Sequence, residues 1–103
     1  YTHVCWNLAR PPFDDPRLRR ALAMAVDRES LIEVVYDGFA LLSRGPVLSS
    51  MWAFNDALEQ VPFEPAGAER LLAEAGWQDR DGDGVLDRDG VPLAFELLAP
   101  AER

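Results

Sequence analysis

The residues best suited to chemistry in this 103-residue chain are carboxylates in an acidic, glycine-rich stretch near its C-terminal end. Asp79, Asp81 and Asp83 alternate there, and Gly84 follows at the sixth position. This spacing matches the opening of an EF-hand calcium loop, in which alternate oxygens converge on a hard cation. The stretch is therefore a candidate metal site for a structural calcium ion, and the sequence predicts no other cofactor.

The remainder of the stretch matches that loop only in part. The Val85 carbonyl would supply position 7 and Asp87 position 9, but Gly90 stands at position 12, where a bidentate glutamate belongs. Two interpretations stay open. In one, calcium neutralises the carboxylates and stabilises an extracellular structural or adhesive module built on residues 79–90. In the other, the stretch is a solvated acidic turn that leads into a β-hairpin, with Asp-Gly supplying left-handed residues.

A second set of reactive side chains lies at the N-terminal end. His3 and Cys5 share one face of an expected strand, about 7 Å apart by the strand rise. A nucleophile and its base need hydrogen-bond contact and a third, orienting group, and the sequence signals neither. The chain is therefore predicted not to be an enzyme.

The amino-acid composition disfavours several classes of binding partner. Ten Lys and Arg residues against 18 Asp and Glu give a formal net charge of −8, which disfavours binding to nucleic acid phosphates or to anionic lipid. A single cysteine excludes an internal disulfide framework and zinc sites built from several cysteines. No apolar run reaches the ~18–20 residues of a membrane span.

Three helices are expected, each with a recognisable start. In chain order these starts are Asp15 before Pro16, Asp27, and Glu64 before Pro65, where the acidic residue is the N-cap and proline the first helical position. Asp37-Gly38 ends the second helix and Gly76 the third. Apolar stripes that include Leu22 in the first helix and Leu72 in the third predict the core.

Strands are expected at both ends of the chain. Residues 1–8 alternate in polarity, which predicts a strand with Val4, Trp6 and Leu8 facing inward. Residues 39–61 lack periodicity and are expected to form a loop, and residues 93–98 alternate again. The predicted fold class is α+β, with helices packed on a few strands. Because the chain opens on strand-like residues without a methionine, we expect residues 1–103 to be a single truncated domain of a longer protein.

Several linked motifs, in order along nearly the whole chain, resemble the family 5 extracellular solute-binding proteins, the peptide and nickel receptors of bacterial ABC importers. The motifs are Pro11–Leu22 with Ala25–Glu29, then Tyr36–Ala40, Gly45-Pro46, Pro65–Trp77, the Asp-Gly turn and Pro92–Leu98. One departure is the glutamate at position 64, which is usually aspartate in such sequences.

The resemblance implies a two-lobed, type II periplasmic-binding-protein-like fold, with this chain at the start of the C-terminal lobe. It implies a receptor on the periplasmic or extracellular side that captures a small solute, such as a peptide or a nickel chelate, and delivers it to ABC permease subunits. Contact with the membrane would come only through the full-length protein's anchor. The first strand would run beside the cleft, so His3, Cys5 and Asn7 are candidate ligand contacts, or simply the wetter side of a strand. Trp52 is a further candidate contact, with local packing as the alternative.

Overall fold

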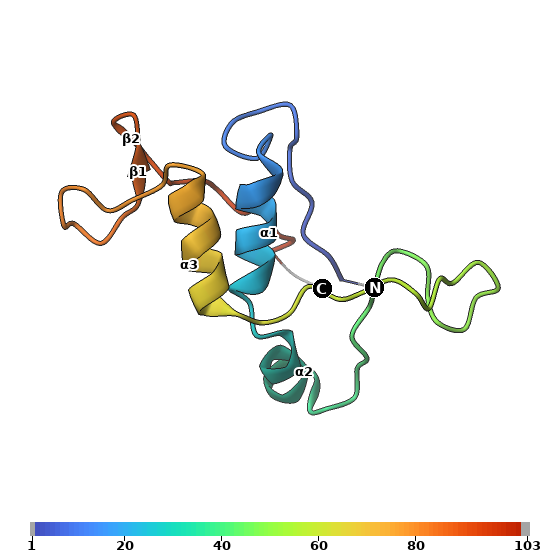
Figure 1. Cartoon of the computed structure of the whole chain (residues 1–103). Coiled ribbons are helices and arrows are strands. Elements are labelled where there is room, and N and C mark those ends of the chain that lie inside the picture. The colour runs from blue at the N-terminus through green and yellow to red at the C-terminus, as the bar shows by residue number, and fades with distance from the viewer. Residues whose placement is uncertain (1, 102–103) are drawn as a thin grey trace.

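The computed structural model describes residues 2–101 and contains three helices and one small hairpin. The helices are α1 (Pro16–Met24), α2 (Arg28–Tyr36) and α3 (Pro65–Glu74), and the hairpin pairs β1 (Asp87–Arg88) with β2 (Val91–Pro92) in antiparallel fashion. Helices α1 and α3 lie side by side, whereas α2 and the loop after it extend away from this pair (Figure 1). The expected α+β class and the three expected helices are confirmed.

Two of the three predicted helix starts are capped as expected. The Asp15 carboxylate accepts the Arg17 backbone N–H at 2.9 Å, and the Asp27 carboxylate accepts that of Ser30 at 3.0 Å. The third prediction was wrong in its mechanism, because the Glu64 side chain makes no cap hydrogen bond. Its longer side chain instead forms an ion pair with Arg70 at 3.1 Å.

The core lies between α1, α3 and the residues just after α3. One cluster joins Leu18, which is fully buried, to Ala75 and Trp77. A second cluster joins residues 21, 24 and 68, and a Cβ on Gly67 would lie 2.6 Å from the Met24 Cε. Glycine therefore permits the close approach of the two helices. The predicted core residues 22 and 72 are half-buried against these clusters.

The two predicted terminal strands are absent from the residues that the structure describes, so both predictions were wrong. Val4 and Leu8 are exposed, and only Trp6 turns inward. Trp6 stacks on Phe13 at 5.1 Å between ring centroids, and both rings meet Phe95 edge-on. Alternating polarity gives a segment two faces, but a strand also needs a neighbour with which to share backbone hydrogen bonds. Residues 2–8 have no such neighbour in the described part of the chain, and of residues 93–98 only Leu93 has one, because its N–H donates to the Leu86 carbonyl at 2.7 Å.

The hairpin near the C-terminal end is built by the Asp89-Gly90 turn. Both turn residues have positive φ, 54° and 77°, as tight two-residue hairpin turns require. Arg88 fastens the hairpin to the end of α3, because its guanidinium donates to the Ala75 carbonyl at 3.2 Å and lies 4.7 Å from the centre of the Trp77 ring. The acidic turn that leads into a hairpin, one of the two open interpretations, is thus present. No helix in the described part is long and apolar enough to cross a membrane.

The Asp15 cap supplies a prediction about stability and pH. Hydrogen bonds from the Arg17 side chain are the main reason that the pKa of Asp15 lies below its ordinary value of 3.8. Replacing Asp15 with alanine should lower the free energy of unfolding by about 1 kcal/mol at pH 7, the usual cost of a lost N-cap. Because a lowered pKa stabilises the fold only while the carboxyl is ionised, this difference should shrink as the pH falls below 3.8 and through the lowered pKa.

Urea denaturation at pH 7 and pH 3 measures both parts of this prediction. The Asp14→Ala variant is the matched control, since Asp14 is exposed and lies next to the cap without forming it. We expect the control to change stability by less than about 0.5 kcal/mol. An Asp15→Ala loss that is equal at both pH values would contradict the ionic origin of the cap's contribution.

Candidate functional site

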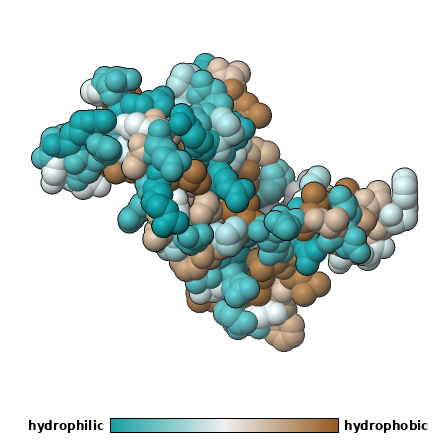
Figure 2. All heavy atoms as spheres, viewed as in Figure 1, coloured by the Kyte–Doolittle hydropathy of each residue, from teal (hydrophilic) through white to brown (hydrophobic). Residues whose placement is uncertain are grey.

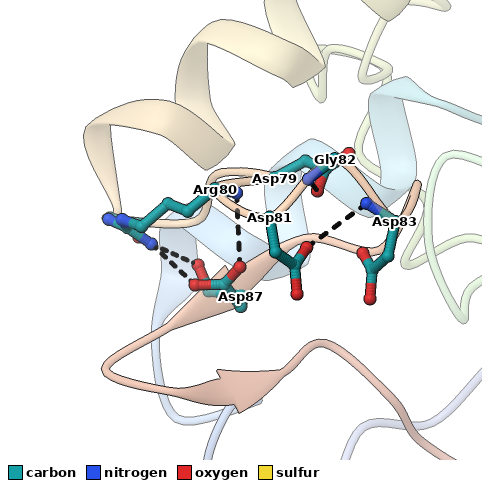
Figure 3. A network of polar contacts seen from close by, with 7 residues as sticks. Asp79, Arg80, Asp81, Gly82, Asp83 and Asp87 are labelled. Atoms are coloured by element: carbon teal, nitrogen blue, oxygen red, sulfur yellow. Dashed lines mark hydrogen bonds and ion pairs between the residues drawn. The ribbon is translucent and has the colours of Figure 1, made fainter.

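The acidic loop between α3 and β1 is held in place by hydrogen bonds between its aspartate side chains and its own backbone N–H groups. The Asp79 carboxylate accepts the N–H groups of Gly82 at 2.9 Å and Gly84 at 3.0 Å. Asp81 accepts the N–H of Asp83 at 3.3 Å, and Asp83 accepts that of Val85 at 2.8 Å. Figure 3 shows the Asp81 and Asp83 side chains projecting from the same side of the loop. Short side chains that cap nearby N–H groups hold such a loop in place without strands or helices.

Three of the five predicted metal ligands are brought together. One oxygen from each of Asp79, Asp81 and Asp83 lies within 4.8 Å of the others, and all three residues are exposed. Three neighbouring carboxylates repel one another, and a hard cation among them would relieve that repulsion. The geometry therefore provides a partial set of oxygen ligands open to solvent.

Asp87 lies apart from this group. Its carboxylate forms an ion pair with the Arg80 guanidinium at 3.1 Å and accepts the Arg80 backbone N–H at 3.3 Å (Figure 3). Arg80 also donates to the backbone carbonyls of Asp87 and Gly76, so it joins the loop to the end of α3. Val85 contributes its N–H to Asp83, and a role for its carbonyl as a ligand stays a prediction. Sequence reasoning missed Arg80, although an arginine between acidic residues is a signal that could have been weighed.

Calcium should therefore bind the loop weakly. Position 12 is Gly90 and position 9 is engaged by Arg80, so we expect an affinity no tighter than about 10⁻⁴–10⁻³ M. Thermal unfolding with increasing calcium, with and without a chelator, measures it, since the stabilisation follows RT ln(1 + [L]/Kd). The Asp81→Asn variant should remove whatever response is present, and Glu96→Gln is a control outside the loop. A sub-micromolar, chelator-reversible affinity would contradict this expectation and favour the calcium-stabilised module.

The predicted solute contacts lie in two segments. His3, Cys5 and Asn7 are exposed and belong to the irregular segment before α1, where the Asn7 side chain accepts the Ala9 N–H at 3.2 Å. Trp52 lies in the long loop between α2 and α3 and is 96% exposed. Trp52 therefore makes little contact with the rest of residues 2–101, and both local packing and ligand contact stay predictions for it. Contact with a ligand stays a prediction for all four residues.

The long loop that carries Trp52 is tied at two points that the sequence did not reveal. The Arg44 guanidinium donates to the Asp56 carbonyl at 2.8 Å, which joins two parts of the loop that are twelve residues apart. The Arg28 side chain, at the start of α2, donates to the Val61 carbonyl. These bonds give an otherwise irregular segment a defined path.

The same arrangement of helices and hairpin occurs in solved solute-binding proteins. In the oligopeptide-binding protein AppA from Bacillus subtilis, solved with a nonapeptide, the match has a TM-score of 0.79 at 36% identity and covers 84% of this chain and 18% of that one. In NikZ from Campylobacter jejuni, solved with Ni(L-His), the TM-score is 0.78 at 32% identity, over 85% of this chain and 17% of that one. The fold thus defines a segment of a solute-binding protein.

Sequence comparison places the chain in a particular family. Residues 1–103 match the family described as bacterial extracellular solute-binding proteins, family 5 Middle, and the chain belongs to it. The curated AppA sequence is 37% identical over 99 residues, which is 94% of this chain and 18% of AppA. Heme-binding protein A from Haemophilus influenzae is 37% identical over 75 residues, 73% of this chain and 14% of that protein. The chain therefore spans less than a fifth of the length of these relatives.

Proposed function

We propose that residues 1–103 form part of the C-terminal lobe of an extracytoplasmic receptor that captures a small solute for a bacterial ABC importer. The observation that carries this proposal is family membership over the whole chain, supported by the structural match to AppA. The receptor hands its ligand to permease subunits and takes no part in a chemical reaction. It works on the periplasmic or extracellular side of the membrane, which it touches only through its own anchor.

In this part of the receptor, a packed helical portion supports irregular segments that carry the predicted ligand contacts. Helices α1 and α3 pack around Leu18 and Trp77 and form the rigid portion. The predicted contacts lie on irregular segments attached to it, as binding residues commonly do in proteins with a rigid scaffold. Asn7 is placed at the point where the N-terminal segment turns toward α1, because the Arg10 N–H donates to its carbonyl.

A peptide is the ligand class that these side chains suit best. A peptide presents backbone amides, which the polar side chains of His3 and Asn7 can hydrogen-bond, and apolar side chains, which an exposed indole such as Trp52 can cover. Nickel chelates and heme are named for relatives of this chain and are the competing ligands. The calcium-stabilised module is the alternative function, and the carboxylate group of the acidic loop is the one feature that favours it.

Calorimetric titration of the complete receptor with di- to pentapeptides tests the proposal. We expect micromolar binding, weakened about fivefold or more when Asn7 or Trp52 is changed to alanine, since each change removes a contact worth about 1 kcal/mol or more. Asp83→Asn, in the acidic loop, is the matched control and should leave peptide affinity unchanged. Binding of Ni(L-His) or heme without any peptide would contradict a peptide ligand, and binding of none of these would contradict the receptor itself.

A further inference from the structure

Three aromatic rings from distant parts of the chain contact one another. Trp6 stacks on Phe13 with 5.1 Å between ring centroids, and Phe95 meets both edge-on, at 5.2 Å from Phe13 and 6.4 Å from Trp6. We call residues 6, 13 and 95 the ring cluster. Other apolar side chains lie open at the surface, as Figure 2 shows around α2 and the segment that follows it, whereas these rings pack on one another. Stacked and edge-on pairs are the arrangements that aromatic rings favour, so the cluster joins the N-terminal segment to the C-terminal one.

Two rings of the cluster flank the turn that carries Asn7. The Asn7 carbonyl accepts the Arg10 N–H at 3.2 Å, and the Arg10 carbonyl accepts the Phe13 N–H at 3.0 Å. The Asn7 side chain also accepts the Ala9 N–H at 3.2 Å. Because these hydrogen bonds all lie within residues 7–13, they give the turn its shape without fixing where Asn7 lies relative to the hairpin and α3.

Side chains hold the N-terminal side of this turn on the molecule. Residues 2–8 share no backbone hydrogen bond with another segment in the part of the chain that the structure describes. Trp6 is half-buried and contacts two other rings. The Thr2 and Tyr36 hydroxyls lie 3.4 Å apart between exposed side chains, which is long for a hydrogen bond between oxygens. The ring cluster is therefore a stronger attachment for this segment than the contact at Thr2.

Phe95 connects the cluster to the rigid portion of the fold. Two residues before it, the Leu93 N–H donates to the Leu86 carbonyl at 2.7 Å, directly beside the hairpin. Both leucines pack against the core cluster that contains Leu18. A chain of contacts therefore runs from the core to the residues beside the hairpin, then to Phe95, and from its ring to the turn that carries Asn7.

We propose that Phe95 is a positioning residue of the solute site: through Trp6 and Phe13, its ring holds the turn that presents Asn7. This inference rests on the proposed function, in which Asn7 contacts the ligand. A receptor binds only in the fraction of molecules whose contact residues are in place, and its apparent affinity falls with that fraction. Removing the Phe95 ring should therefore weaken binding without removing a ligand contact.

Amide hydrogen exchange on the complete receptor without ligand tests whether Phe95 holds the turn. In the Phe95→Ala variant, fragments covering residues 7–13 should exchange about fivefold faster or more, while those covering α1 and α3 stay unchanged. This factor corresponds to the loss of a ring contact worth about 1 kcal/mol. The Phe95→Tyr variant should exchange like the wild type, since it keeps the ring and Phe95 is 45% exposed, which leaves room for the hydroxyl in water. Glu96→Ala, which truncates the neighbouring exposed side chain, is the matched control.

Peptide calorimetry on the same variants tests whether the position of the turn matters for the ligand. Phe95→Ala should weaken peptide binding about threefold or more, and Phe95→Tyr should restore it. In a receptor that already carries Asn7→Ala, the Phe95→Ala change should have a clearly smaller effect, because both residues act through one contact. A residue that only stabilised the fold would weaken binding equally in both backgrounds.

The outcomes separate this inference from the proposed function. Unchanged exchange at residues 7–13 in Phe95→Ala overturns the inference, even where peptide binding is normal. Faster exchange with unchanged peptide affinity, or equal losses in both backgrounds, makes Phe95 purely structural and also overturns it. If α1 and α3 also exchange faster in Phe95→Ala, the Phe95→Leu variant, which keeps an apolar side chain without the ring, is judged by the same criteria. A wild-type receptor that binds no peptide contradicts the proposed function and the ligand role of Phe95, while the exchange result still reports on the ring cluster.

Discussion

The isolated chain should bind a peptide about a thousandfold more weakly than the complete receptor. The proposed receptor closes two lobes around its ligand, and residues 1–103 offer only part of the contacts. A receptor that binds at ~1 μM has a binding free energy of about −8 kcal/mol, and losing half of it takes the affinity to about 1 mM. Part of the lost binding free energy comes from enclosure of the ligand. In the isolated chain, candidate contacts such as Trp52 are exposed, so one side of a bound peptide would stay open to water.

Parallel calorimetry on the isolated chain and the complete receptor, with the same pool of di- to pentapeptides, measures the difference. Circular dichroism of the isolated chain is the control for folding, since an unfolded chain would lose affinity for a different reason. A clear micromolar isotherm from the folded chain alone would contradict the prediction, and it would mean that residues 1–103 contain nearly the whole binding site.

Truncating Leu18 should remove most of the stability of the isolated chain. Leu18 is the largest fully buried side chain among the described residues, and it packs in one cluster with Ala75 and Trp77. Leu-to-Ala changes at such sites cost about 2–5 kcal/mol, because the lost transfer free energy is joined by the cost of the cavity. Small domains have total stabilities of similar size. We therefore expect a substantial fraction of the Leu18→Ala variant to be unfolded at room temperature without denaturant.

Chemical denaturation gives the magnitude, and Leu98→Ala is the matched control. The control makes the same change at a side chain that is 90% exposed, so its effect on the isolated chain should stay within about 0.5 kcal/mol. Leu22→Ala and Leu72→Ala should fall between the two, since both residues are half-buried against the core. Equal losses for Leu18→Ala and Leu98→Ala would contradict the core described here.

Much of the helical structure was predictable because helix ends are determined locally. An aspartate cap followed by proline defines the start of α1 with bonds that span only two residues, and Asp37-Gly38 ends α2 through left-handed backbone conformations. The hairpin turn at Asp89-Gly90 has the same local origin. The order of motifs along the chain also predicted the family, which the comparison over residues 1–103 confirmed.

The geometry of the acidic loop depends only in part on residues that are neighbours in the sequence. The spacing of Asp79, Asp81 and Asp83 predicted their convergence, because side chains that cap N–H groups two to five residues away are arranged by the loop itself. Asp87 also has the spacing of a calcium ligand, but its carboxylate does not join the other three. Its neighbour Arg80 competes for the carboxylate, and that competition depends on the position of the hairpin relative to α3.

The sequence by itself determined the helix ends, the turns and the family, since each depends on neighbouring residues or on motif order. Tertiary structure decided which apolar side chains are buried and which alternating segments pair as strands. Residues 2–8 and 93–98 carry strand-like alternation, yet they meet through the rings of Trp6, Phe13 and Phe95 rather than through backbone hydrogen bonds. The stripes of α1 and α2 are both apolar, yet Leu18 is buried and Val34 exposed. The physical reason is that burial and strand pairing each require a partner surface that is distant in the chain. Periodicity identifies the apolar face of a segment, but it does not identify the surface that packs against that face.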